Sequence, residues 1–215
     1  MSDNSRENDQ TGRRYHSPRR IQQAEATRRA ILQAARTLFA EYGYQATTLH
    51  AIAQEAGVAV PTLYAVFGSK PAILSALVKS TGADADIRTL AQEAFTEPEP
   101  VRQLRLAAGV MRSILERDAD IVDLHWQAGD GDPDLAAAWR QSHHQRLARL
   151  GELMGVLASK EALKPGLEIE TATEILWSLS SPEVYRLLVR ERGWTPQRFE
   201  DWLADTAITL LLHNT

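Results

Sequence analysis

The most informative spacing of residue types in this chain lies between Thr47 and Lys70. Near the end of that stretch, Leu63, Val66 and Phe67 recur at helical spacing and are predicted to point inward. The opposite face is left to Ala59, Pro61, Thr62 and Tyr64. The sequence therefore predicts a short helix with one open face, a pattern that suits a helix placed in a DNA major groove.

The open face of this short helix lacks the side chains that read bases most strongly. It contains no Arg, Lys, Asn or Gln, so the bidentate pairs that recognise guanine and adenine are absent. Base discrimination is then expected from Thr62, from apolar contact of Ala59, Val60 or Pro61 with thymine methyl groups, and from DNA shape. We expect each base position to contribute little.

The rest of the chain offers few candidates for catalysis or metal binding. Asp130, Asp132 and Asp134 have calcium-loop spacing, but an EF-hand needs Gly where Leu135 stands and Glu where Gln141 stands. There is no nucleophile elbow, phosphate loop, dinucleotide fingerprint or His-Glu-x-x-His motif. We therefore expect no metal, no cofactor and no enzymatic activity.

Aromatic and sulfur-containing side chains gather in the second part of the chain, and they allow two interpretations. They either pack a core or surround an apolar cavity for a flat or greasy ligand, with His125 or His143 as its polar contact. On the second interpretation, the candidate pocket residues are Met111, His125, Trp126, Trp139, His143 and Trp177.

The elements that must position the open face are two short helices and a longer one before them. Thr47 or Thr48 is expected to cap the first short helix, and Gly57 to end it. Two helices this short cannot bury a core alone. Residues 21–42 supply the third helix, which ends at Gly43 and carries the inward stripe Ile31, Ala35, Leu38, Phe39 and Tyr42.

The remaining pattern is helical throughout, so the fold class is all-α. We expect a helix-turn-helix domain with a linking helix at 21–81 and an all-helical domain at 82–215. Body helices are predicted at 86–95, 101–117, 121–128, 134–159 and 196–210, and over 169–193, where Pro182 either kinks one helix or starts a second. Residues 1–20 are interpreted as a disordered, arginine-containing arm, which either follows DNA or is a solvated tail.

The composition fits a protein of the reducing cytoplasm. The net charge of −4 divides into +4 over residues 1–80 (10 Lys and Arg, 6 Asp and Glu) and −8 over the remainder (14 and 22). A basic amino-terminal part suits a polyanion-binding domain, although uneven solvated charge gives the same sum. The chain has no cysteine, no predicted signal peptide and no apolar run long enough for a membrane span.

Residues 38–74 resemble the DNA-binding domain of the tetracycline-repressor (TetR) family. The resemblance rests on the sequence LFAEYGYQATTLHAIAQEAGVAVPTLYAVFGSKPAIL. Its matching features are the aromatic-Gly-Tyr, Thr-Thr, Ile-Ala-x-x-Ala-Gly-Val, Thr-Leu-Tyr and Phe-x-Ser-Lys motifs in the family's order. Two departures are Ala59, where the family often has Ser or Thr, and Pro61, where it often has Gly.

The resemblance implies specific roles for residues of this chain. Thr47 or Thr48 would donate to a DNA phosphate, Lys70 would hold another phosphate, and Ala59, Val60, Pro61, Thr62 and Tyr64 would face the groove. The helical domain would hold an effector pocket. The last two helices would pair with those of a twofold mate through Leu176, Leu179, Leu187, Trp202, Leu203 and Leu210.

These observations together predict a homodimeric transcription regulator, most consistent with a repressor that binds a near-palindromic operator in double-stranded DNA. A small apolar or aromatic effector is expected to change its affinity for that operator. The alternatives are a small helical enzyme or ligand-binding protein whose amino-terminal helices are structural, and a protein that compacts DNA without sequence preference.

Overall fold

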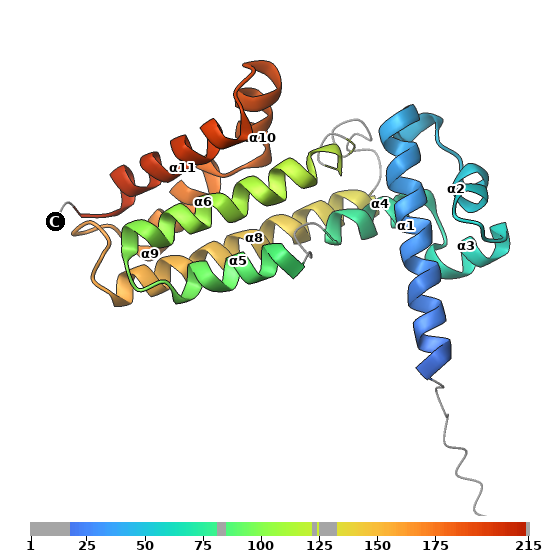
Figure 1. Cartoon of the computed structure of the whole chain (residues 1–215), viewed down its shortest axis with the longest axis horizontal. Coiled ribbons are helices and arrows are strands. Elements are labelled where there is room, and N and C mark those ends of the chain that lie inside the picture. Colours follow the sequence, from blue (N-terminus) through green and yellow to red (C-terminus); the bar gives the residue numbers. More distant parts are fainter. Residues whose placement is uncertain (1–17, 81–84, 122–123, 125–132, 214–215) are drawn as a thin grey trace, which may run out of the picture.

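The computed structural model describes residues 18–80, 85–121, 124 and 133–213, and every regular element in these ranges is a helix. Figure 1 shows a small group of helices, α1 to α4, beside a longer body formed by α5, α6, α8, α9, α10 and α11. Helix α1 lies across the direction of the body helices (Figure 1). The expected all-α fold with two helical parts is confirmed.

Helix α1 spans Pro18–Ala46 and is the scaffold of the small part. It begins three residues before the predicted start, so residues 18–20 belong to this helix and not to the arm. Residues 1–17 lie outside the described residues. Gly43 leaves helical geometry with φ 79° and ψ 163°, so the regular helix ends where the sequence predicted.

The helix-turn-helix follows, and its boundaries match the sequence chemistry. Helix α2 spans Leu49–Glu55, α3 spans Val60–Phe67 and α4 spans Lys70–Lys79. The Thr48 hydroxyl accepts from the amide of Ala51 at the start of α2, and Ser69 caps α4 in the same way. Gly57 and Gly68 adopt φ of 66° and 77°, which allows the tight turns before and after α3.

A single apolar core holds α1 to α4 together. It contains Ile31, Ala34, Ala35, Phe39, Tyr44, Ile52, Ala53, Leu63, Ile73, Leu74, Leu77, Val78, Ile121 and Leu124. The prediction that Tyr42 lies in this core was wrong: Tyr42 is 59% exposed, whereas Tyr44 is 7% exposed and stacks on Phe39. The break at Gly43 rotates the chain, so the aromatic residue after the glycine turns inward.

The body consists of antiparallel helices around a second core. Helices α5 (Ala85–Thr96), α6 (Pro100–Arg117) and α8 (Pro133–Ser159) form one side (Figure 1). Helices α9 (Ile169–Leu179), α10 (Pro182–Tyr185) and α11 (Pro196–Leu211) complete it. Of the helix predicted at 121–128, only residues 121 and 124 are described.

The segment after α10 departs from α-helical geometry. Residues Arg186–Glu191 form a π-helical turn, η1, in which the amide of Arg192 donates to the carbonyl of Leu187. Ser181 caps α10, and Pro182 occupies its first turn, so this proline starts a new helix after α9. A π-turn inserts one residue into a helix, and nothing in the apolar spacing of the sequence predicted it.

Arg36 links the two parts of the molecule. Its guanidinium group forms ion pairs with Asp118 at 3.1 Å and Asp120 at 2.7 Å, just after α6, and also donates to the carbonyl of Arg117. Burial opposes the charge of this guanidinium, but the two carboxylates outweigh burial and raise the pKa of Arg36. The apolar spacing of the sequence gives no indication of this link.

Candidate DNA-binding surface and ligand cavity

Helix α3 has one face in the core and one face in solvent. Leu63 is completely buried, whereas Ala59, Pro61, Thr62 and Tyr64 are exposed. Val60 is only half-exposed because it packs on the core of α1 to α4. The exposed face therefore presents one hydroxyl, one phenol and small apolar groups, without any formal charge.

Local contacts fix the orientation of α3 at both ends. Ala59 takes the N-cap position but has no side chain to accept a hydrogen bond, so the first turn of α3 relies on Pro61 and on Gly57 before it. At the other end, the guanidinium of Arg28 lies 4.5 Å from the ring centroid of Phe67. This contact ties α3 to α1.

The two threonines before α2 have different environments. Thr47 is buried, and its hydroxyl donates toward the carbonyls of Gly43 (2.8 Å) and Leu38 (3.2 Å). Thr48 is exposed, and its hydroxyl oxygen accepts from the amide of Ala51 at 3.1 Å. The hydroxyl hydrogen of Thr48 is therefore the one of the two that can reach a group outside the chain.

Lys70 makes three hydrogen bonds and one cation–π contact within the chain. Its ammonium group donates to the carbonyls of Tyr44 (2.8 Å), Thr47 (3.0 Å) and Gln45 (3.3 Å), and lies 4.5 Å from the Tyr44 ring centroid. Burial lowers the pKa of this group. These contacts join the start of α4 to the turn between α1 and α2, a role that sequence spacing did not reveal.

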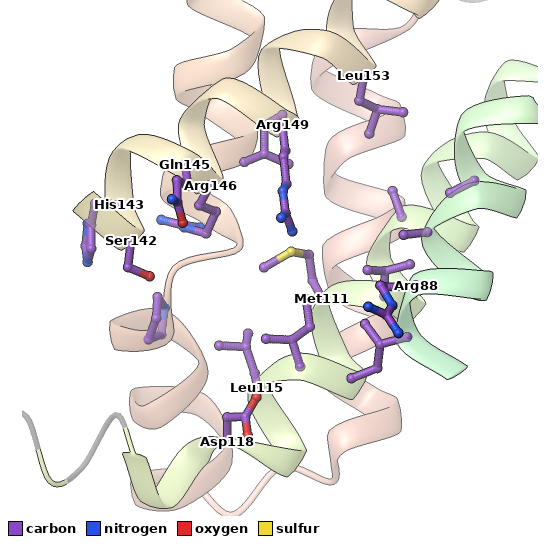
Figure 2. Close-up of a pocket in the computed structure, with 18 of the residues that line it drawn as sticks. Arg88, Met111, Leu115, Asp118, Ser142, His143, Gln145, Arg146, Arg149 and Leu153 are labelled. Atoms are coloured by element: carbon purple, nitrogen blue, oxygen red, sulfur yellow. The ribbon is translucent and has the colours of Figure 1, made fainter. Parts of the chain in front are cut away.

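A cavity of about 360 Å³ lies in the body beside the joint with the smaller part. Helices α4, α5, α6 and α8 supply most of its lining, and Figure 2 shows side chains from several helices converging on it. Its apolar wall includes Val78, Ile87, Phe95, Val110, Met111, Ile114, Leu115, Leu150 and Leu153. The volume falls in the range of small-molecule sites.

Three of the six predicted pocket residues line this cavity, namely Met111, Trp139 and His143. Trp177 is not in its lining, but its ring centroid lies 5.6 Å from that of His143. The ring centroids of Trp139 and His143 are 4.9 Å apart, so the three rings form one group at the edge of the cavity. His125 and Trp126 lie outside the described residues.

Arg146 is the most enclosed of the cationic lining residues that sequence reasoning missed. Its Nη1 donates toward the carbonyls of Trp177 (3.0 Å) and Ser180 (3.1 Å) and the Ser180 hydroxyl (3.1 Å). Its guanidinium carbon lies 4.8 Å from the Trp177 ring centroid. Nη2 is buried without an acceptor among the described residues. Burial lowers the pKa of Arg146 to about 10, against the opposing charge of Glu183.

The cavity lining is cationic. It includes the side chains of Lys79, Arg88, Arg146 and Arg149, and its one carboxylate among the described residues is Asp118, which is paired with Arg36. Arg149 extends from α8 toward Met111, and Arg88 lies on the α5 side (Figure 2). Asp118 therefore connects the cavity wall to α1.

The predicted dimer contacts divide into two groups. The prediction was wrong for Leu176 and Leu203, which are 4% and 0% exposed in the core of the body and have no surface to offer a second chain. Leu187 and Leu210 are 45% and 43% exposed, while Leu179 and Trp202 are partly buried. Both α9 and α11 contain buried leucines and leucines that are at least partly exposed, and their spacing in the sequence does not tell which of them face the core.

Comparison with protein families and curated proteins supports the interpretation of the small part. The model of bacterial regulatory proteins of the tetR family matches residues 31–77, which run from within α1 nearly to the end of α4. The chain is 29% identical over 171 residues to the uncharacterized HTH-type transcriptional regulator YdeS of Bacillus subtilis strain 168. That match covers 77% of this chain and 80% of YdeS.

Solved structures extend the likeness to the body. NalD, the secondary repressor of the MexAB-OprM multidrug efflux pump in Pseudomonas aeruginosa, matches with a TM-score of 0.69 and 23% identity, over 90% of this chain and 100% of NalD. FadR from Bacillus subtilis, in complex with stearoyl-CoA, matches with a TM-score of 0.70 and 18% identity, over 84% and 97% of the two chains. At these identities the two structures establish a common fold.

None of the described helices is long and apolar enough to cross a membrane.

Proposed function

Since this chain belongs to the tetR family of bacterial regulatory proteins, we propose that it is a cytoplasmic repressor that binds a near-palindromic operator as a homodimer. The observation that carries this proposal is the open face of α3. That face is exposed while Leu63 anchors the helix to the core, so α3 can enter a groove without unfolding anything. An effector in the body cavity then weakens operator binding.

Each residue of the open face has a proposed contact. Thr62 and Tyr64 reach base edges, and Ala59 and Pro61 contact thymine methyl groups. Val60 contributes at the edge of this surface because half of it packs inward. Thr48 donates to a phosphate at the start of α2, where the helix terminus also favours negative charge.

We assign Thr47 and Lys70 mainly to the fold of this surface. Thr47 donates to carbonyls at the end of α1, and Lys70 joins that same end to α4. A phosphate contact by Lys70 requires its ammonium to exchange at least one carbonyl for the phosphate oxygen. That exchange is tested below by the salt dependence of binding.

Homodimerisation supplies the second recognition helix. One helix of eight residues reads few base pairs, and a twofold pair of such helices about one DNA turn apart solves that problem. Leu187 and Leu210 are exposed on the carboxy-terminal helices, with Leu179 and Trp202 partly exposed beside the core. We propose these residues as the apolar contacts between the two chains.

The cavity is connected to the DNA-binding part by two routes. Asp118 lines the cavity and pairs with Arg36 of α1, and α4 carries Val78 and Lys79 into the cavity wall. An effector that binds one arrangement of these contacts more tightly than another shifts the spacing of the two α3 helices. The shift in operator affinity cannot exceed the effector's differential affinity for the two arrangements.

A gel shift with the DNA upstream of this chain's own gene tests the proposal. The full chain at moderate salt is expected to retard that DNA specifically, in the presence of excess unrelated competitor. Uniform retardation of both DNAs would instead indicate compaction without sequence preference. No retardation at micromolar protein would favour a ligand-binding protein or enzyme whose helix-turn-helix is structural.

A further inference from the structure

We propose that the effector cavity takes an amphipathic organic anion, with Arg149 contacting its anionic group and Arg146 supplying an enclosed positive charge beside it. This inference rests on the proposed effector role of the cavity, and it names the chemical class of the effector. The expected apolar or aromatic body of the ligand is retained, but a carboxylate or similar anionic group is added to it.

The first argument is the environment of Arg146. Its guanidinium is largely enclosed, yet its hydrogen bonds within the described residues go to two carbonyls and one hydroxyl, and no carboxylate among those residues bonds to it. A buried charge without a counter-charge is costly. Glu183 raises the pKa of Arg146 through its charge but forms no ion pair with it, so an anion in the cavity would supply the paired counter-charge.

The second argument is the position of Arg149 and Arg88. Arg149 belongs to α8 and Arg88 to α5, and both are solvent-exposed residues of the cavity lining. Neither forms an ion pair with a carboxylate of the described residues. Arg149 points across the cavity toward the sulfur of Met111, while Arg88 lies on the α5 side (Figure 2). A guanidinium group can bind a carboxylate through two parallel hydrogen bonds.

The third argument is the balance of charge and apolar surface in the lining. Four cationic residues and one carboxylate belong to the described lining, and that carboxylate is already paired with Arg36. Such a cavity attracts anions and repels organic cations. The rest of its wall is aliphatic or aromatic, from Ile87 and Phe95 to Leu150 and Leu153. A hydrocarbon or aromatic body fits that wall.

A matched series of ligands tests this inference on the full chain without DNA. Decanoate, decanol and decyltrimethylammonium have the same chain and differ in charge, and octanoate and dodecanoate bracket its length. Binding is measured by isothermal calorimetry and by the intrinsic tryptophan fluorescence of the chain, to which Trp139 of the cavity lining contributes, below the micellar concentration. We expect at least one of the carboxylates to bind about tenfold or more tightly than its alcohol, and the ammonium compound to bind more weakly than the alcohol.

Three variants assign the preference to residues. Arg149→Gln and Arg146→Met are each expected to reduce the ratio of carboxylate to alcohol affinity about tenfold. Arg140→Gln, an exposed arginine of α8 outside the cavity lining, should leave the ratio unchanged. Arg149 is exposed, so its replacement leaves the core intact, and circular dichroism checks the fold of Arg146→Met.

The inference is overturned if no carboxylate binds, if alcohol and carboxylate bind equally, or if the preference survives in both cavity variants. None of these results bears on operator binding, which the gel shift measures separately. Conversely, a chain that prefers carboxylates but fails to retard its upstream DNA would retain the ligand class and lose the repressor function.

Discussion

Lys70 is suited by its charge to bind phosphate, but in this structure it stabilises the fold. Its ammonium group holds three carbonyls at the turn between α1 and α2, and that turn sets where α2 begins. The family resemblance of the sequence implied a phosphate contact for Lys70, the first residue of α4. It could not reveal these acceptors, because they lie 23 to 26 residues earlier in the chain.

Replacing Lys70 with methionine is expected to lower the free energy of unfolding by about 1–2 kcal/mol, since three carbonyls lose a charged donor. Urea denaturation followed by circular dichroism measures this change. Lys79→Met on the same helix is the control, because Lys79 is exposed. Equal stability of the two variants would contradict the structural role.

The same Lys70 variant tests the proposed phosphate contact. If Lys70 holds a phosphate in the complex, the slope of log affinity against log salt falls by about one. An unchanged slope together with lower stability would assign Lys70 to the fold alone.

Thr62→Val keeps the shape of the side chain and removes the hydroxyl from the open face of α3. We expect the ratio of operator to random-DNA affinity to fall several-fold, because few other polar groups read bases there, while the salt slope stays constant. Competitive gel shifts measure the ratio. Thr89→Val on α5, also exposed, should leave it unaltered; a constant ratio in Thr62→Val would remove Thr62 from base recognition.

At the scale of elements, the helices and their ends were accessible from the sequence because capping and apolar spacing are local. Thr48, Gly43 and Gly57 act where the sequence placed them. The π-turn η1 and the inward turn of Tyr44 depend on packing against other helices. The spacing of apolar residues along the chain therefore predicts neither feature.

The junction of α1 with the segment after α6 is an element-scale contact that can be measured. Arg36 is partly enclosed between Asp118 and Asp120, whereas Arg105 pairs with Asp205 in an exposed position. Arg36→Gln is expected to lower the free energy of unfolding by about 1–3 kcal/mol, and Arg105→Gln by less than about 1 kcal/mol.

Chemical denaturation of both variants checks this difference. A loss in Arg36→Gln no larger than in Arg105→Gln would show that the link contributes little. If the link also transmits the effector signal, Arg36→Gln should bind decanoate normally in the calorimetric assay but release the operator less.

At the scale of the whole molecule, the body was predicted as a helical unit, but its surface was not. Leu203 and Leu210 are both leucines of α11, and the packing of α11 on α6 and α9 buries the first and leaves the second exposed. Arg146 was missed for the same reason, because its partners lie on the segment from Trp177 to Ser180.

Leu210→Glu tests the proposed assembly. The charge is expected to disrupt an apolar contact between two chains, which shifts the molar mass in light scattering from dimer to monomer and weakens operator binding at least tenfold. Val101→Glu is the control, since Val101 is an exposed apolar residue at the start of α6. A Leu210→Glu protein that remains dimeric would place the interface elsewhere.

Val78 belongs to two structures at once, because it is buried in the core of α1 to α4 and also lines the cavity. A substitution of Val78 that changes which effector the cavity binds therefore also changes the packing beneath the helix-turn-helix. Mutations that alter both effector choice and the stability of the helix-turn-helix should therefore lie mainly on α4. Directed evolution of a biosensor from this chain would do better to diversify Val110, Ile114 and Leu153, which shape the cavity from α6 and α8.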